Sequence, residues 1–172
     1  MMVIKTKRFI LRPFRKGDEF TLAKNINNKK IYKYTQNIPY PYTLDHARVW
    51  VKVNLKEQKR KKPKKLNFVI EIDREVAGSI GFNKIYVHKA EIGYWLAEKY
   101  WDNGIMTQSL KLVSKFGFEK LKLKSIFATV FYSNKASARV LGKAGYKKEG
   151  LLKNHIIKDK KLKNVYLFTK LK

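Results

Sequence analysis

The 172-residue sequence contains no cysteine, and no apolar run in it approaches the roughly 18 residues that a membrane-spanning helix needs. The absence of cysteine excludes disulfides, thiolate zinc sites and a cysteine nucleophile, and it fits a reducing compartment, so we expect a cytoplasmic protein with no membrane partner. Only three histidines occur, His46, His88 and His155, and their scatter predicts no metal site. The N-terminal segment has neither the long apolar stretch nor the cleavage site of a signal peptide.

Acidic residues are scarce. Thirteen Asp and Glu face 40 Lys and Arg, which gives a formal net charge of +27. A field of this sign attracts polyanions, so association with RNA or the ribosome is one interpretation, and a general lysine bias of the host is the other. Only seven of the 40 cations are arginine, which argues against specific bidentate recognition of phosphate. With 44% hydrophobic residues the chain can nevertheless fill a core.

Apolar periodicity predicts the order β-α-α-β-β-β-α-β-α-β-β without a repeat or linker, hence a single domain over residues 1–172. A strand–helix–strand unit in the middle implies a parallel pair, so we expect an α/β (α+β) fold with a mixed sheet of about seven strands and about four helices. The segment Ile31–Tyr42 is expected to be irregular. The expected strands are 2–12, Leu66–Ile72, Val76–Ile85, Ala90–Ala97, Ser125–Tyr132, Tyr146–Ile157 and Leu162–Leu171; helices begin at Gly17-Asp18, Thr43, Gly104 and Asn134.

The most informative stretch is Glu91–Ser109, where a strand ends, a turn follows and a helix begins. Backbone N–H groups at the start of a helix have no intrahelical partner, and the helix dipole adds positive potential, so this junction suits a phosphate or pyrophosphate. Gly104 lets the backbone approach an anion without a Cβ in the way. A lone glycine before a helix is also a common turn residue, so this signal alone is weak.

Six motifs, in order and nearly end to end, resemble the GNAT superfamily of acetyltransferases, and in particular its RimJ/RimL-like branch, which modifies ribosomal-protein N-termini. The motifs are Thr6–Phe14, Ile38–Tyr42, Gly78–Phe82, Glu91–Leu96, Trp101–Thr107, and Asn134–Ser137 together with Gly145–Gly150. The resemblance implies two neighbouring strands that splay apart around acetyl-CoA, with the pantetheine arm lying along Glu91–Leu96. The implied cofactor-binding residues are Trp95, Leu96, Asn103, Gly104, Ile105, Met106, Thr107, Asn134 and Ser137.

The sequence departs from the family pattern at several positions. Trp101 replaces a common Gln or Arg, and Met106 replaces a small residue. Gln108 stands where this branch often has Glu, while Lys153 and Asn164 stand where Arg and Asp often occur. Lys153 and Asn164 remove an ion pair that the family pattern would allow, so the departures affect the substrate side of the cleft more than the cofactor side.

Two residues are candidates for catalysis. Glu91, an acidic residue in an apolar strand, is the candidate base that accepts the amine proton directly or through water, and the alternative is an exposed carboxylate or ion-pair partner. Ser137 is the candidate hydrogen-bond donor to the leaving thiolate, with Tyr132 as a second candidate, and the alternative for Ser137 is a first-turn serine bonded to the backbone. Asn134 is expected both to cap its helix and to contact the cofactor.

Further residues are candidates for the edges of the site. Arg139 and Lys143 are candidates for the nucleotide phosphates or plain surface charges, and Trp50, Tyr40 and Tyr42 are candidates for the acceptor pocket or for core packing. The resemblance implies acetyl transfer from acetyl-CoA to a primary amine, first of all a protein N-terminal α-amine. The alternatives are a small-molecule amine acetyltransferase and a catalytically silent RNA- or ribosome-binding module, and a homodimer stays open.

Overall fold

The computed structural model describes residues 3–172, and its strands form one mixed sheet with the order β1-β2-β3-β4-β5-β6-β8-β7. Every neighbouring pair is antiparallel except β5 and β6. The expected mixed sheet with a parallel pair is thereby confirmed. The strands are β1 (Ile4–Lys5), β2 (Ile10–Arg12), β3 (Leu66–Ile72), β4 (Glu75–Ile85), β5 (Lys89–Leu96), β6 (Ser125–Phe131), β7 (Lys147–Lys158) and β8 (Lys161–Leu171).

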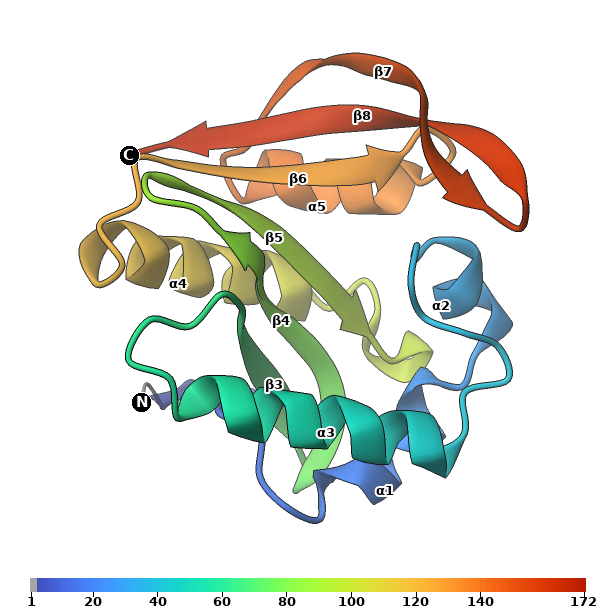
Figure 1. Cartoon of the computed structure of the whole chain (residues 1–172), viewed down its shortest axis with the longest axis vertical. Helices are drawn as coiled ribbons and strands as arrows, with labels where there is room; N and C mark the ends of the chain where they lie inside the picture. Colours follow the sequence, from blue (N-terminus) through green and yellow to red (C-terminus); the bar gives the residue numbers. More distant parts are fainter. Residues whose placement is uncertain (1–2) are drawn as a thin grey trace.

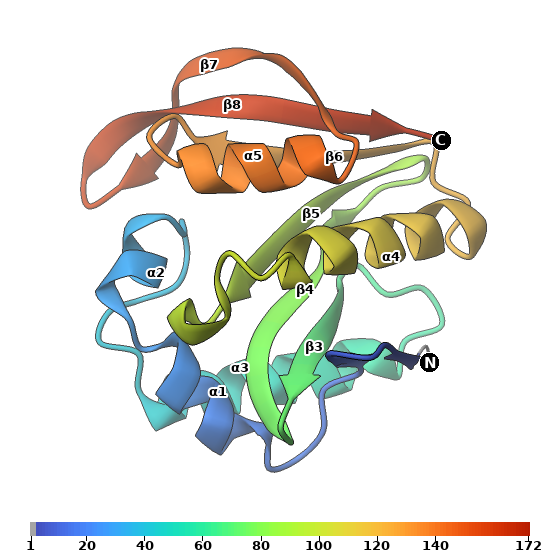
Figure 2. The same cartoon turned by 180° about the vertical axis from the view of Figure 1, so that it is seen from behind.

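Helices cover both faces of this sheet (Figure 1, Figure 2). In Figure 1 α1 and α3 lie in front of β3 and β4, whereas Figure 2 shows α4 and α5 in front on the opposite face. The α-helices are α1 (Asp18–Ile26), α2 (Lys29–Lys33), α3 (Leu44–Gln58), α4 (Ile105–Glu119) and α5 (Lys135–Lys143), and a short 3-10 turn, η1, covers Glu98–Tyr100.

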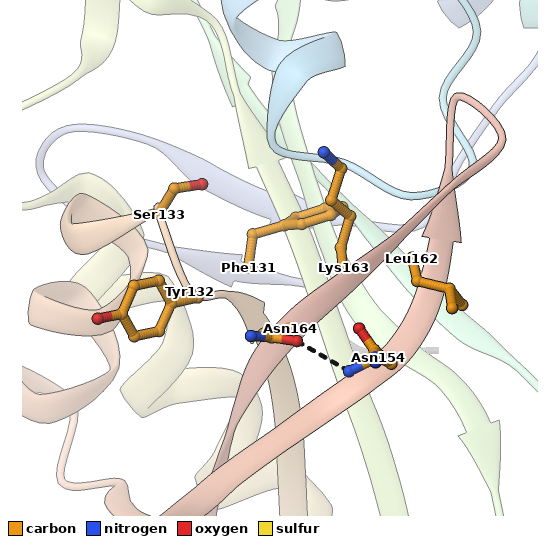
Figure 3. A pocket seen from close by; sticks show the side chains of 7 residues that line it. All are labelled: Phe131, Tyr132, Ser133, Asn154, Leu162, Lys163 and Asn164. Atoms are coloured by element: carbon orange, nitrogen blue, oxygen red, sulfur yellow. Dashed lines mark hydrogen bonds between the residues drawn. The ribbon is translucent and has the colours of Figure 1, made fainter.

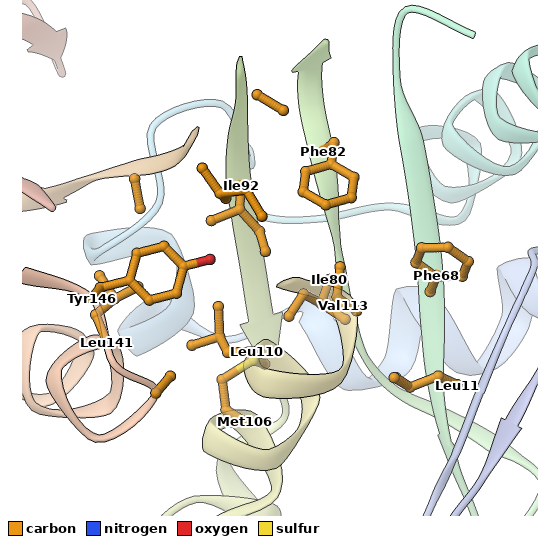
Figure 4. Close-up of a cluster of buried hydrophobic side chains, with 14 of the residues drawn as sticks. Leu11, Phe68, Ile80, Phe82, Ile92, Met106, Leu110, Val113, Leu141 and Tyr146 are labelled. Carbon is orange, nitrogen blue, oxygen red and sulfur yellow. The ribbon is translucent and has the colours of Figure 1, made fainter. Parts of the chain in front are cut away.

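The alternation of side chains along each strand produces two separate cores. On one face Phe68, Ile80 and Ile92 pack against Leu110 and Val113 of α4 (Figure 4). On the other face Val69, Val76 and Trp95 pack against α1 and α3. The sheet therefore separates the two cores, and successive side chains of one strand pack on opposite faces of it.

Two expectations were wrong in detail. The single strand expected at 2–12 is a pair, β1 and β2, because Thr6 turns the chain: its backbone N–H and its hydroxyl both donate to the carbonyl of Phe9, at 3.0 and 2.8 Å. Met2, the first residue of that expectation, lies outside the described residues. The start of the segment expected to be irregular, Ile31–Tyr42, is helical in α2, because the Asn28 side chain caps the N–H groups of Lys30 and Ile31. Within residues 3–172 there are accordingly eight strands and five α-helices.

Candidate functional site

The parallel strands β5 and β6 pair over only three positions and then separate. Lys89, Ala90 and Glu91 face Ser125, Ile126 and Phe127, and no pairing follows although β5 continues to Leu96 and β6 to Phe131. Figure 1 shows the two strands diverging beyond this point. The backbone groups of β5 that face β6 after Glu91 therefore have no strand partner, which leaves hydrogen-bonding capacity for an extended ligand.

A cleft of about 1130 Å³ occupies the space between the separated strands. It reaches from the start of α4 and α5 on one face of the sheet to α2 and α3 on the other. Of the cofactor candidates, all but Asn103 line it, and so does Glu91. The lining candidates are Trp95, Leu96, Gly104, Ile105, Met106, Thr107, Asn134 and Ser137.

The start of α4 is open to an anion. Gly104 occupies the N-cap position with φ 71°, and no side chain caps the helix. The first-turn N–H groups of α4 therefore have no helical acceptor, and they lie at the positive end of its dipole. An added Cβ at Gly104 would meet only the guanidinium of Arg8, at 3.9 Å, so the space in front of these amides is free. This geometry fits a diphosphate.

Two side chains hold the loop before α4 in place. The indole N–H of Trp101 donates to the carbonyl of Leu96 at 2.7 Å, which fastens the loop to the end of β5. Arg8 donates to the carbonyl of Asn103 and to the Gln108 side chain, at 2.5 and 3.1 Å. Asn103 points back into this loop, where its amide donates to the Trp101 carbonyl at 2.9 Å. The departure at Trp101 thus supplies an anchor of its own, and Arg8 is a site residue that sequence reasoning missed.

Side-chain alternation on β5 divides the candidate residues between the two faces. Trp95 belongs to the core beneath α1 and α3, whereas Leu96 belongs to the core beneath α4. Only the backbone of Trp95 is therefore available on the α4 face. Glu91 has the same parity as Trp95 and points towards the α1–α3 side, with 22% of its side chain exposed. Its nearest cation is Lys84, whose Nζ lies 3.9 Å from Oε2.

Ser137 lies on the α4–α5 side of the sheet, in the first turn of α5. Its backbone N–H donates to Oδ1 of Asn134 at 3.1 Å, so Asn134 caps the helix as expected. The Ser137 hydroxyl is not used by the backbone and lies 2.7 Å from the phenolic oxygen of Tyr94. Burial raises the pKa of Tyr94 to about 12, so the phenol keeps its proton at neutral pH and can donate to Ser137. Tyr94 is a second site residue that sequence reasoning missed.

The remaining candidates separate clearly. Arg139, Lys143, Trp50 and Tyr42 line the cleft, whereas Tyr40 does not and is 40% exposed. Tyr132 turns outward at the end of β6, where it packs against Tyr166 with ring centroids 5.2 Å apart. It lines a separate small depression with Asn164 on the outer side of β6 and β8 (Figure 3). There the Asn164 side chain accepts from the backbone N–H of Asn154 at 2.8 Å.

The charge of the cleft suits a phosphorylated ligand. Seven cations line it against two acids, Glu91 and Asp102. Arg139 and Lys143 are four residues apart, hence on one face of α5. The cations are Arg8, Lys30, Lys65, Lys84, Lys111, Arg139 and Lys143.

Comparison with known proteins decides the family. Residues 8–147 match the family model of the acetyltransferase (GNAT) domain. The chain belongs to the GNAT acetyltransferase family. It is similar over its whole length to an uncharacterized N-acetyltransferase, p20, of Bacillus licheniformis, with 28% identity over 100% of this chain and 97% of the relative. The GNAT-family acetyltransferase of Bacillus anthracis has a TM-score of 0.85 at 27% identity, covering 99% of this chain and 98% of that one.

The GNAT fold also relates the chain to RimL, a ribosomal alpha-N-protein acetyltransferase solved in complex with coenzyme A. The TM-score is 0.89 at 22% identity, with 99% of this chain and 98% of RimL covered, which shows a shared fold. The chain is thus a GNAT-family N-acetyltransferase with structural neighbours among the RimL-type enzymes.

None of the helices within residues 3–172 has the length and apolar character that a membrane span requires.

Proposed function

We propose that the protein transfers an acetyl group from acetyl-CoA to the α-amine of a polypeptide N-terminus. The observation that carries this proposal is the separation of β5 from β6 beside an uncapped α4, because it combines an extended groove with an anion site. The pantetheine arm would lie along β5 from Ile92 to Leu96, and the amides of Ile105, Met106 and Thr107 would hold the diphosphate. Arg139 and Lys143 would meet the remaining phosphate charge.

The two faces of the sheet would divide the chemistry. The acceptor would enter from the α2–α3 side, past Tyr42 and Trp50, and meet Glu91 on that face. An α-amine has a pKa of roughly 7.7–8.0, so near neutrality it needs only a modest base to become a nucleophile. Glu91 would accept that proton directly or through water. The nitrogen–carbon bond forms as the carbon–sulfur bond breaks, and Ser137 would donate a hydrogen bond to the departing sulfur from the opposite face.

Structural relatives support a polypeptide acceptor. RimL, which shares the fold over nearly its whole length, is described as acting on a protein α-amine. The cleft is also open on the acceptor side and carries five cations besides Arg139 and Lys143, which disfavours polycationic small amines such as spermidine. These features favour an N-terminus in a locally anionic setting.

A substrate panel tests the proposal. Purified protein is incubated with acetyl-CoA and either peptides with a free α-amine, the same peptides with a blocked N-terminus and an internal lysine, or spermidine. Thiol release gives the rate, and mass spectrometry locates the acetyl group. We expect kcat/KM for free N-termini to exceed that of the blocked peptides at least tenfold. If spermidine proved the best acceptor, the protein would be a small-molecule amine acetyltransferase. The absence of thiol release with every acceptor would contradict the proposed acetyl transfer itself.

A further inference from the structure

Cations collect at one end of the sheet, away from the open end of the cleft. The segments 59–65, 84–89, 120–124, 147–148 and 170–172 contain fifteen Lys and Arg and not one Asp or Glu in 23 residues. We call these five segments the basic edge. They include the last residues before β3 and β6, the ends of β4 and β8, and the starts of β5 and β7.

Backbone pairing places these segments in one row. Ile85 donates to the carbonyl of Lys64 at 3.0 Å, Lys124 donates to that of His88 at 2.7 Å, and Lys172 donates to that of Lys124 at 3.1 Å. Figure 1 shows the resulting edge on the left, with the α3–β3 loop, the end of α4 and the C-terminus. Because β5 and β6 are still paired here, the row runs unbroken over six neighbouring strands, about 24 Å at about 4.8 Å a strand.

Several acids lie at the other end of the sheet, whereas Glu57 and Glu91 lie beside the basic edge, where they pair with Arg60 and Lys84. Glu71 and Glu75 flank the β3–β4 turn, Glu98 follows β5, and Asp159 lies in the β7–β8 turn. Lys24 and Lys99 pair there with Glu75, and Lys30 pairs with Glu98. Among residues 3–172, no ion pair involves Lys62, Lys89, Lys124 or Lys172 of the basic edge. Fifteen cations in 23 residues, with these four lysines unpaired, are a concentration that favours a function over a general lysine bias.

An aromatic side chain interrupts the cations of the basic edge. Tyr86, in the turn between β4 and β5, is 47% exposed, and the ammonium of Lys89 lies 5.7 Å from its ring centroid. Its neighbour Val87 is 97% exposed. A row of unpaired lysines beside an exposed ring is the arrangement that binds single-stranded nucleic acid, because lysines follow the phosphates and the ring stacks on a base. A membrane surface would call for a broader apolar face.

We propose that the basic edge binds single-stranded RNA. The basic edge meets the acetyl-transfer cleft at Lys65 and Lys84, whereas Lys62, Tyr86, Lys89, Lys124 and Lys172 do not line that cleft. An enzyme held on RNA by this end of its sheet would keep the opposite, open end of its cleft free for an acceptor. The inference stands on the charge distribution and is independent of the acceptor.

The test compares two variants of equal charge. The edge variant carries Lys62→Gln, Lys89→Gln, Lys124→Gln and Lys172→Gln. The matched control replaces four exposed lysines elsewhere, Lys16→Gln, Lys52→Gln, Lys160→Gln and Lys161→Gln. A fluorescein-labelled 20-nucleotide single-stranded RNA is titrated with each full-length protein, and anisotropy is followed at several salt concentrations.

The edge variant should bind the RNA at least tenfold more weakly than the wild type at low salt, and the control should stay within threefold. Since each lost phosphate contact reduces the log–log salt slope by roughly 0.7 for a single strand, the slope of the edge variant should fall by roughly 2–3. A Tyr86→Ala variant should weaken binding about tenfold with the salt slope unchanged, because it removes stacking and no charge.

Three results would overturn the proposal. One is the absence of saturable RNA binding, and another is an equal loss in the edge and control variants, which would reduce the effect to net charge. The third is edge-dependent binding to phosphatidylserine vesicles that exceeds binding to RNA. Both variants are also titrated with coenzyme A, and their affinities should match that of the wild type. This control shows that the variants are folded, and it makes a failure of RNA binding distinguishable from a failure of the proposed acetyl transfer.

Discussion

The phenolic oxygen of Tyr94 lies 2.7 Å from the hydroxyl oxygen of Ser137. This contact joins the part of β5 that does not pair with β6 to the first turn of α5, across the cleft. A serine that accepts from a neighbouring phenol has its own proton free for another acceptor. Because burial raises the pKa of Tyr94 to about 12, the phenol keeps its proton and can donate to Ser137 throughout the neutral range. We therefore expect the pair to direct the Ser137 hydroxyl towards the departing thiolate of the proposed reaction.

Replacement of Ser137 by Ala should lower kcat about 10- to 100-fold, because a hydrogen bond to a charged group is worth roughly 1.5–3 kcal/mol. The Kd of coenzyme A should change little. Ser133→Ala, an exposed serine four residues earlier, is the control and should keep the wild-type rate. Tyr94→Phe should have a smaller effect that vanishes in the Ser137→Ala background. Additive effects in the double variant would disconnect Tyr94 from the function of Ser137.

Replacement of Gly104 by Ala should weaken coenzyme A binding at least tenfold. At φ 71° an alanine costs roughly 1–2 kcal/mol, so it would disturb the turn that presents the α4 amides. Gly142→Ala, in the last turn of α5 with nothing within 4 Å of the new Cβ, is the matched control. It should raise stability by about 0.4–1 kcal/mol and leave binding unchanged. Calorimetry measures the coenzyme A affinity, and urea unfolding measures the stability. If Gly104→Ala bound coenzyme A as tightly as the wild type, Gly104 would not be part of the phosphate site.

Glu91→Gln should slow acetylation of a peptide N-terminus more at pH 7 than at pH 9, because at pH 9 most of the amine has already lost its proton. The measurement is kcat/KM from pH 6 to 10. Asp102→Asn, which changes the other acid of the cleft, should leave the shape of the profile unchanged. A constant ratio of variant to wild-type rates across the range would mean that Glu91 is not the base.

Tyr42→Phe should make the protein less sensitive to alkali. Burial raises the pKa of Tyr42 to about 12, against 10 for the ordinary phenol. As pH rises, the phenol therefore loses its proton in the unfolded chain before it does so in the folded protein. The contribution of the protonated Tyr42 to the free energy of unfolding is complete below pH 10 and is lost as pH rises from 10 to 12. Between pH 9 and 11 the wild type should lose about 1 kcal/mol more than the variant in urea unfolding. Tyr40→Phe, at an exposed position, is the control and should lose as much stability between pH 9 and 11 as the wild type. The same loss in Tyr42→Phe would mean that the Tyr42 ring is solvated and would contradict the prediction.

The sequence predicted the sheet and most of its boundaries because strand alternation and caps are local signals. Thr43 and Asn134 cap their helices as expected, and Asp73 with Arg74 forms the β3–β4 turn. The helix α2 was missed because its stability depends on distant contacts: Asn28 and Lys30 both bond Glu98, about 70 residues away. A five-residue helix has too few residues for a periodic signal.

The site was predictable in its backbone and less so in its side chains. The glycine before α4 and the polar Asn134–Ser137 start of α5 stand out in the sequence, whereas Tyr94 resembles any aromatic residue in an apolar strand. Its value comes from Ser137, which the fold brings to it from 43 residues away. Arg8 reaches the α4 loop across 95 residues in the same way. Pairings of this kind depend on tertiary structure, which spacing along the chain does not encode.

An amide-resolved titration with coenzyme A tests the central claim most directly. In ¹H–¹⁵N spectra of the labelled protein, saturable addition of coenzyme A should shift the amides of Ile105, Met106 and Thr107 most strongly, together with those of β5 from Ile92 to Leu96. These are the uncapped start of α4 and the stretch of β5 that does not pair with β6. Saturable shifts confined to other surfaces, or no saturable shift at all, would contradict the account.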